Sequence, residues 1–149
     1  MKTELYHYLE SGLRNIWLVN GFTVCETDYG RGVSIDEVAG LHQVIAKRLI
    51  ENKPRLSGGE FRFLRKELGL SQAKLGKLWG YDAQTVAIWE KRGRVPIIAD
   101  RFIRVYYREV AEGNANIVEM IEHLNDLDLH EDSRLMFEEK RGQWQAKAA

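Results

Sequence analysis

The chain has 149 residues, 44% of them hydrophobic, and its equal numbers of basic and acidic side chains give a formal net charge of zero. This length suits one compact globular domain or two small ones. No run of about 18 apolar residues occurs, and the first ten residues lack the apolar core of a signal peptide, so we expect a cytoplasmic protein with no membrane partner. The single cysteine, Cys25, excludes a disulfide bond within the chain.

The N-terminal residues 1–52 predict a small α+β domain. Ile16–Val19 and Phe22–Cys25 are apolar runs on either side of Asn20-Gly21, a pair that readily adopts the positive backbone angles of a two-residue hairpin turn. A third short strand is expected over residues 29–35. These features predict a β-hairpin or small sheet.

A helix is expected to follow these strands. Ser34 stands three residues before Glu37, the spacing of a capping box at a helix start. The apolar stripe of this helix would consist of Val38, Leu41, Ile45 and Leu49. The hairpin would pack on that stripe through Trp17, Val19, Phe22 and Val24. We expect Cys25 to be half-buried and His42 to lie at the edge of the core.

Residues 57–69 carry the signals of a capped helix that follows a polar linker. Ser57 and Glu60 form a second capping-box pair, and Gly69 can adopt the left-handed conformation that commonly ends a helix. Between them, Phe61, Leu64 and Leu68 recur at helical spacing. The helix should therefore begin near residue 58 and run for about three turns.

Two more short helices are predicted between residues 71 and 91. Ser71 can cap the first of them and Gly80 can end it, while Asp82 can cap the second. The inward-facing residues would be Leu75, Gly76, Trp79, Val86 and Trp89. Because so little chain separates these two helices, they must cross steeply, and Gly76 would let a neighbouring helix approach closely.

This segment resembles the lambda-repressor-like, or Xre-type, helix-turn-helix family of transcriptional regulators. The matching residues are Leu64-Arg65, Gly69-Leu70-Ser71-Gln72, Leu75-Gly76, Gly80 and Trp89-Glu90. The resemblance implies a DNA-binding domain over residues 56–112 and a largely buried ion pair between Arg65 and Glu90. It also implies that Gln72 bonds a phosphate or a base edge. The residues it places toward the major groove are Asp82, Ala83, Gln84, Thr85 and Ile88.

One departure from that family affects base recognition. The family often has a polar residue and an arginine before the tryptophan, where this chain has Ala87-Ile88. Gln84 is then the best-equipped base reader, because its amide can pair with both N6 and N7 of adenine. Ala83, Thr85 and Ile88 can contact thymine methyl groups, so a half-site containing A and T is expected. The alternative is that Gln84 is a solvated helix residue.

The zero net charge is an average over unlike segments. Residues 56–111 hold eleven basic and six acidic side chains, a net charge of +5, whereas residues 112–149 hold four basic and nine acidic ones, a net charge of −5. A phosphate responds to the local field rather than to the total charge. The candidate phosphate ligands are Lys91, Arg92, Arg94, Arg101 and Arg104. Each of them could instead belong to an ordinary solvated basic face.

The C-terminal part predicts further helical structure and a dimer. A helix is expected over residues 98–111, with Phe102, Ile103, Val105 and Tyr106 available for packing. Within residues 114–149, Ile117, Met120, Ile121 and Leu124 form an apolar stripe on an acidic helix. This stripe either forms a homodimer contact or covers the domain's own core. The tail from Glu138 to Ala149 is expected to be poorly ordered, with Trp144 as its one anchoring side chain.

The order of the segments resembles bacterial antitoxins of the MqsA (YgiT) type. That resemblance implies an N-terminal domain that binds a toxin-like protein partner and a C-terminal domain that binds the operator. The family's zinc is held by two Cys-x-x-Cys pairs, and here only Cys25 is present, so we expect no structural zinc and no other cofactor.

The sequence thus predicts a mainly α, overall α+β protein that binds double-stranded DNA as a homodimeric repressor. The alternative is an antitoxin-like interaction protein that binds a partner through its N-terminal domain and represses its own operon. An enzyme is not expected, because none of the common phosphate-loop, dinucleotide, serine-lysine or zinc-protease motifs occurs.

Overall fold

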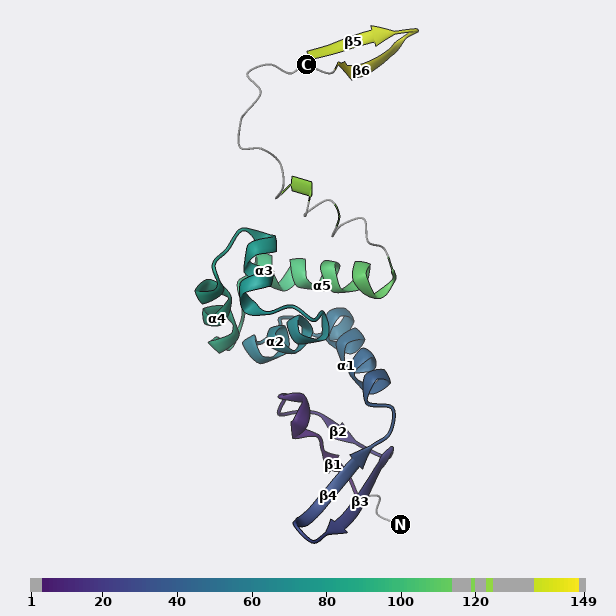
Figure 1. Cartoon of the computed structure of the whole chain (residues 1–149), viewed down its shortest axis with the longest axis vertical. Coiled ribbons are helices and arrows are strands. Elements are labelled where there is room, and N and C mark those ends of the chain that lie inside the picture. The colour runs from purple at the N-terminus through teal and green to yellow at the C-terminus, as the bar shows by residue number, and fades with distance from the viewer. Residues whose placement is uncertain (1–3, 114–118, 120–122, 125–135, 148–149) are drawn as a thin grey trace.

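The computed structural model describes residues 4–113, 119, 123–124 and 136–147, and it is mainly helical with small two-stranded sheets. The helices are α1 (Val38–Asn52), α2 (Gly58–Glu67), α3 (Gln72–Trp79), α4 (Ala83–Lys91) and α5 (Ile97–Ala111), with a short 3-10 helix η1 (Leu9–Ser11). The strands are β1 (Tyr6–His7), β2 (Trp17–Leu18), β3 (Phe22–Thr27), β4 (Gly30–Ile35), β5 (Met136–Lys140) and β6 (Gln143–Lys147). The N-terminal strands lie at one end of the helical body (Figure 1). The expected α+β class is confirmed.

The three predicted helices of residues 57–91 are all present, and their caps are the expected ones. Ser57 and Glu60 form a reciprocal capping box at the start of α2. The Ser71 hydroxyl accepts a hydrogen bond from the Lys74 amide at the start of α3, and Asp82 accepts one from the Thr85 amide at the start of α4. These caps satisfy backbone N–H groups that a helix start would otherwise leave without a partner.

Gly76 allows the close approach that the sequence predicted, but the neighbour is a turn rather than a helix. A Cβ atom at this position would lie 2.6 Å from the Tyr81 carbonyl oxygen, in the turn between α3 and α4. The Tyr81 amide also donates a hydrogen bond of 2.7 Å to the Gly76 carbonyl. The missing side chain therefore fixes the tight path from α3 into α4.

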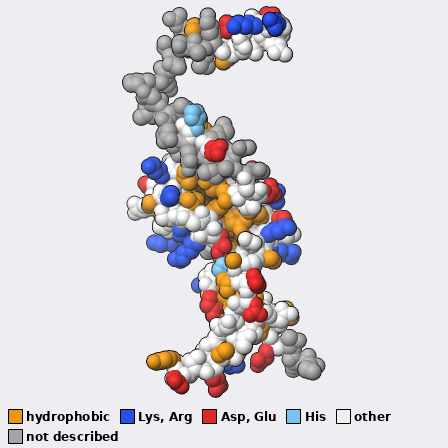
Figure 2. Space-filling model, turned by 45° about the vertical axis from the view of Figure 1, so that its right-hand side comes forward, with side chains coloured by type: hydrophobic (Ala, Val, Ile, Leu, Met, Phe, Trp, Pro, Cys, Tyr) orange, Lys and Arg blue, Asp and Glu red, His pale blue; other side chains and the backbone are white. Residues whose placement is uncertain are grey.

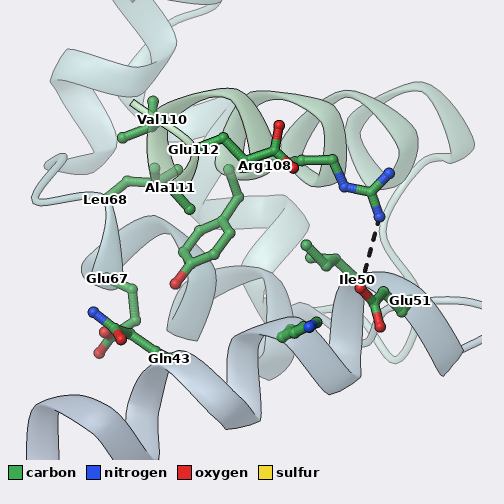
Figure 3. Close-up of a pocket in the computed structure, with 11 residues that line it drawn as sticks. Gln43, Ile50, Glu51, Glu67, Leu68, Arg108, Val110, Ala111 and Glu112 are labelled. Atoms are coloured by element: carbon green, nitrogen blue, oxygen red, sulfur yellow. Dashed lines mark ion pairs between the residues drawn. The ribbon is translucent and has the colours of Figure 1, made fainter. Parts of the chain in front are cut away.

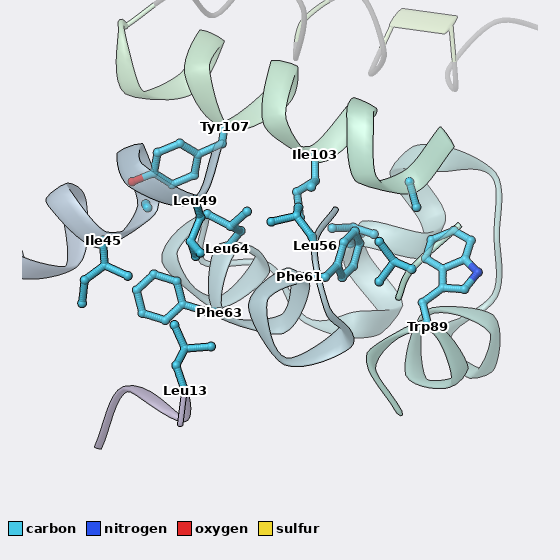
Figure 4. Packing of buried hydrophobic residues seen from close by; sticks show 14 of the residues in the cluster. Leu13, Ile45, Leu49, Leu56, Phe61, Phe63, Leu64, Trp89, Ile103 and Tyr107 are labelled. Carbon is cyan, nitrogen blue, oxygen red and sulfur yellow. The ribbon is translucent and has the colours of Figure 1, made fainter. Parts of the chain in front are cut away.

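A continuous hydrophobic core runs through the helical body and into the N-terminal segment. Its side chains with no exposed surface include Leu56, Phe61, Leu64, Leu75, Val86, Val95 and Ile103. Tyr8, Leu13 and Leu18 from the N-terminal segment belong to the same cluster, and Leu13 lies beside Phe63 of α2 (Figure 4). The N-terminal strands are therefore anchored on the helices by shared packing. The domain boundaries proposed from sequence remain predictions.

The predicted hairpin around Asn20-Gly21 is wrong in its pairing. Gly21 does have a positive φ of 79°, but β2 pairs with β1, and β3 pairs with β4. The two-residue turn lies at residues 28–29, between Thr27 and Gly30, where the Thr27 hydroxyl bonds the Gly30 carbonyl. The Asn-Gly pair thus makes a bend between two sheets, and Gly30 closes the hairpin.

The predicted start of the first long helix is also wrong. Ser34 belongs to β4, and α1 begins at Val38 after Glu37, which has a φ of 50° and makes no side-chain cap. Because Ser34 lies in strand β4, it cannot cap α1, and the predicted capping box with Glu37 does not form. Ile45 and Leu49 are buried as expected, Leu41 is half-buried, and Val38 is exposed.

The hairpin residues expected on that stripe do not cover it. Trp17 is 53% exposed and Val19 is 60% exposed, while Val24 is also exposed and Phe22 is half-buried. Tyr8, Leu13 and Leu18 are the buried residues of this segment instead. Cys25 is exposed rather than half-buried. Of the four hairpin side chains expected on the stripe, Phe22 is the one that packs against the core cluster.

The C-terminal tail is structured where we expected it to be poorly ordered. Strands β5 and β6 form an antiparallel hairpin through a two-residue turn at Arg141 and Gly142, both with positive φ. Trp144 is 73% exposed, so it is not an anchor among the described residues. Of the apolar stripe, Ile117, Met120 and Ile121 lie outside the described residues, and Leu124 is exposed.

Candidate nucleic-acid interface

Aromatic packing fixes the orientation of α4 on the rest of the helical body. The Phe61 ring meets the Trp79 and Trp89 rings edge to face, with centroid distances of 6.0 and 5.9 Å. Tyr81 in the turn packs against Trp89 in the same manner at 4.9 Å. Because Trp89 and Val86 are buried by these contacts, the opposite face of α4 must point to solvent.

The Arg65–Glu90 ion pair joins α2 to the end of α4. The Arg65 Nε and Nη2 atoms donate to the two carboxylate oxygens of Glu90 at 2.7 and 3.0 Å, and Nη1 donates to the Leu70 carbonyl at 2.7 Å. The two side chains are only 8% and 4% exposed. The pair is bidentate and nearly dry, so it holds α4 rather than contacting a ligand.

Gln72 lies at the start of α3 and is half-buried. Its Nε2 atom donates a hydrogen bond of 3.2 Å to Glu90, so part of its amide is used inside the protein. An amide nitrogen carries two donors and the amide oxygen can accept, so Gln72 keeps hydrogen-bonding capacity for a ligand. The structure therefore ties this predicted contact residue to the ion pair beneath α4.

The exposed face of α4 carries three of the residues proposed from sequence. Gln84, Ile88 and Lys91 are exposed and lie at positions i, i+4 and i+7, on one side of the helix. Ile88 is 46% exposed, so this large apolar side chain is available for contact with a ligand. Ala83 and Thr85 are half-buried at the start of the helix. The face thus offers one amide, one apolar side chain and one cation.

Asp82 is exposed but acts as the cap of α4. Its Oδ1 atom accepts the Thr85 amide at 2.7 Å, and this backbone hydrogen bond is the main cause that lowers the pKa of the Asp82 carboxyl. The carboxylate is therefore kept ionised close to the exposed face. Its negative charge disfavours phosphate contact, so the structure points to a capping role for Asp82.

Basic side chains follow α4 directly. Lys91, Arg92 and Arg94 are exposed, and none of the three forms an ion pair within the described part of the chain. On the face seen in Figure 2, Lys and Arg side chains gather on the helical body and on the β5–β6 hairpin, and the N-terminal strands carry mainly acidic and uncharged groups. Three exposed basic side chains therefore lie at the C-terminal end of α4 and just after it.

Arg101 and Arg104 are bound to a buried carboxylate on their own helix. Asp100 has no exposed surface and accepts hydrogen bonds from the Leu56 amide at 2.6 Å, from Arg101 at 2.5 Å and from Arg104 at 2.9 and 3.1 Å. Burial alone would raise the pKa of Asp100, but the bonds from Arg104 and Leu56 hold it below the ordinary value. The Arg104 side chain is only 14% exposed, so Arg104 is structural rather than a phosphate ligand.

Arg101 keeps partial access to solvent. Its side chain is 56% exposed, although Nη1 also donates to the Pro54 carbonyl at 3.3 Å.

Asp100 was not among the residues predicted from the sequence. Its spacing of four residues from Arg104 on a predicted helix was the available signal, since i and i+4 side chains are neighbours.

A separate hollow of about 480 Å³ lies between α1, the end of α2 and α5 (Figure 3). Arg108 and Glu51 face each other across it at 3.9 Å. Glu67 and Glu112 also line it, so its charged groups have mixed sign. Glu67 accepts a hydrogen bond from His42, whose other ring nitrogen bonds Tyr8. His42 thus joins three segments, as expected of a residue at the edge of the core.

Comparison with protein-family models, with curated proteins and with solved structures found no match. Within the described residues, no helix is long and apolar enough to span a membrane. The same residues contain no cluster of three or more His, Cys, Asp or Glu side chains arranged to hold a metal ion.

Proposed function

We propose that the protein is a sequence-specific DNA-binding regulator, not an enzyme, and that α4 is its recognition helix. The observation that carries this proposal is the exposed Gln84, Ile88 and Lys91 face, continuous with basic side chains that have no ion pair among the described residues. A helix whose exposed face offers an amide, an apolar side chain and a cation suits a duplex, because phosphates position such a helix and its side chains read the base edges.

Gln84 is the proposed base reader. It lies in the first turn of α4, and the N-terminal residues of a recognition helix are the ones that contact base edges in helix-turn-helix proteins. Its amide can bond adenine, and Ile88 one turn further along can contact a thymine methyl group. The proposed half-site therefore contains A and T.

The proposed regulator acts in the cytoplasm as a homodimeric repressor on a palindromic operator. A single helix α4 of nine residues can reach only a few base pairs, so one half-site gives limited affinity and selectivity. Two half-sites about one helical turn apart supply both. Light scattering on the free protein and on its complex with duplex DNA would measure this stoichiometry.

Selection of duplex DNA from a random pool by the full-length protein tests the proposal. We expect enrichment of a motif containing A and T in two related half-sites, and binding that weakens steeply with salt because Lys91, Arg92 and Arg94 displace counterions. A pool that stays random after repeated rounds, at low salt and high protein concentration, would reject the proposal.

A second candidate function is the binding of a protein partner by the N-terminal domain. The observation that favours it is the exposure of large apolar side chains there, with Leu9 at 56%, Trp17 at 53% and Val19 at 60%. This antitoxin-like role is compatible with DNA binding. Co-expression with the product of an adjacent reading frame tests it, and a stoichiometric complex lost on Trp17→Ser and Val19→Ser substitution is the expected result.

A further inference from the structure

A groove of about 590 Å³ separates the N-terminal segment from the C-terminal end of α4. One wall is the loop between η1 and β2, which contributes Arg14 and Asn15. The other wall is the end of α4 and the residues after it, with Lys91 and Arg92. Lys53 and the start of α2 complete the lining. Three segments far apart in the sequence therefore converge on one opening.

The free charge in this groove is positive. Its two carboxylates are already committed, since Glu60 bonds the Ser57 amide at 2.8 Å and faces Lys53 at 3.4 Å, and Glu90 is held by Arg65. Both carboxylate side chains are about 5% exposed or less. Arg14, Lys91 and Arg92 are exposed and form no ion pair within the described residues. The groove thus presents cations at its rim and neutralised carboxylates at its base.

We propose that this groove holds the sugar-phosphate backbone of duplex DNA, so that the N-terminal domain extends the DNA interface. The inference rests on the proposed function, because Lys91 lies both on the exposed face of α4 and on the rim of the groove. α4 is about 13.5 Å long, since its nine residues rise 1.5 Å each. A DNA strand that runs along α4 from its base-reading N-terminal end therefore reaches its C-terminal end, and the groove, after that distance. Arg14 and Asn15 then meet a phosphate from the opposite wall, the guanidinium as a charged donor and the amide as a neutral one.

Arg14→Ala is the central test, and Arg31→Ala is its matched control. Arg31 is an exposed arginine on β4, away from the groove, so its removal changes the net charge equally. Binding of both variants and of the wild-type protein to the selected duplex would be measured from 50 to 200 mM salt. Loss of one phosphate contact lowers the slope of log affinity against log salt by about 0.9, so the affinity deficit of Arg14→Ala should shrink about 3.5-fold over this fourfold range.

The outcomes separate the two proposals. An unchanged slope for Arg14→Ala, in a protein that binds DNA with the selectivity of the wild type, overturns the groove assignment and leaves the proposed function intact. Absence of any duplex binding by the wild-type protein overturns both. Equal slope changes in Arg14→Ala and Arg31→Ala would also reject the groove, because they would reflect net charge alone.

The single cysteine makes a positional test available. Asn15→Cys in a Cys25→Ser background places one thiol on the groove wall, and the native Cys25 on β3 is the matched position outside it. A DNA-cleaving iron chelate attached at residue 15 should cut the backbone beside the half-site. The chelate at Cys25 should leave those positions uncut. Identical cleavage patterns from the two positions would contradict the proposal.

Discussion

Replacement of Glu90 by Ala removes the group that holds Arg65 and fixes α4 in place. The Arg65 side chain, which is 8% exposed in the intact protein, then keeps one hydrogen bond, to the Leu70 carbonyl. Gln72 loses its bond as well. Breaking a buried ion pair by removing one partner costs about 3 to 5 kcal/mol, because the surviving charge cannot recover its hydration.

Urea denaturation followed by tryptophan fluorescence measures the loss of unfolding free energy, and thermal denaturation measures the fall in Tm. Trp89 is a suitable reporter because it directly precedes Glu90 and packs against Trp79. For a chain of this size each kcal/mol lowers the Tm by roughly 2 to 4 °C, so a fall of roughly 6 to 20 °C is expected. The double variant Arg65→Leu/Glu90→Leu is the control, because it leaves no unpaired charge and should recover much of the stability. A cost below about 1 kcal/mol for Glu90→Ala, or additive costs in the double variant, would refute the reasoning.

The remaining predictions concern Asp100, Gly76 and Arg94. The folded-state pKa of Asp100 is lowered, so the ionised carboxylate stabilises the fold above the ordinary carboxyl pKa, and this stabilisation is lost as pH falls through the folded-state pKa. Asp100→Asn should therefore lower the unfolding free energy at neutral pH. In denaturation measured from pH 7 to 2, the unfolding free energy of this variant should also depend less on pH. Gly76→Ala should cost about 1 to 3 kcal/mol in the same assay, since the turn carbonyl must move, whereas Gly59→Ala, where the nearest atom is 3.9 Å away, should cost nothing. Arg94→Ala should reduce the salt slope of DNA binding by about one with no change in Tm, and the opposite pattern would contradict its assignment as a phosphate ligand.

The helices of residues 57–91 could be predicted because their signals are local. Each begins with a side chain that caps its own first turn, as Ser57, Ser71 and Asp82 do, and such hydrogen bonds need no distant partner. Burial of Val86 and Trp89 followed from helical periodicity for the same reason. The exposed face of α4 consists of the residues that lie opposite these buried positions.

The N-terminal pairing could not be predicted because local turn signals compete with one another. Asn20-Gly21 and the turn before Gly30 are both able to close a hairpin, and the tertiary packing of Leu18 and Tyr8 decides between them. The hydrogen bonds of Asp100 could not be predicted either, because they too depend on residues that are far apart in the sequence. Its partners Leu56 and Arg104 lie 44 and 4 residues away, and only the fold brings the Leu56 amide to the carboxylate.

Sequence selection with the wild-type protein and with Gln84→Ala, run in parallel from one random pool, tests the central claim that α4 reads bases. The account predicts that the wild-type protein enriches a motif with adenine at one position of each half-site. It also predicts that Gln84→Ala retains the rest of the motif, loses the preference at that position and binds the wild-type site about 1 to 3 kcal/mol more weakly. Identical motifs and affinities from the two proteins would contradict it.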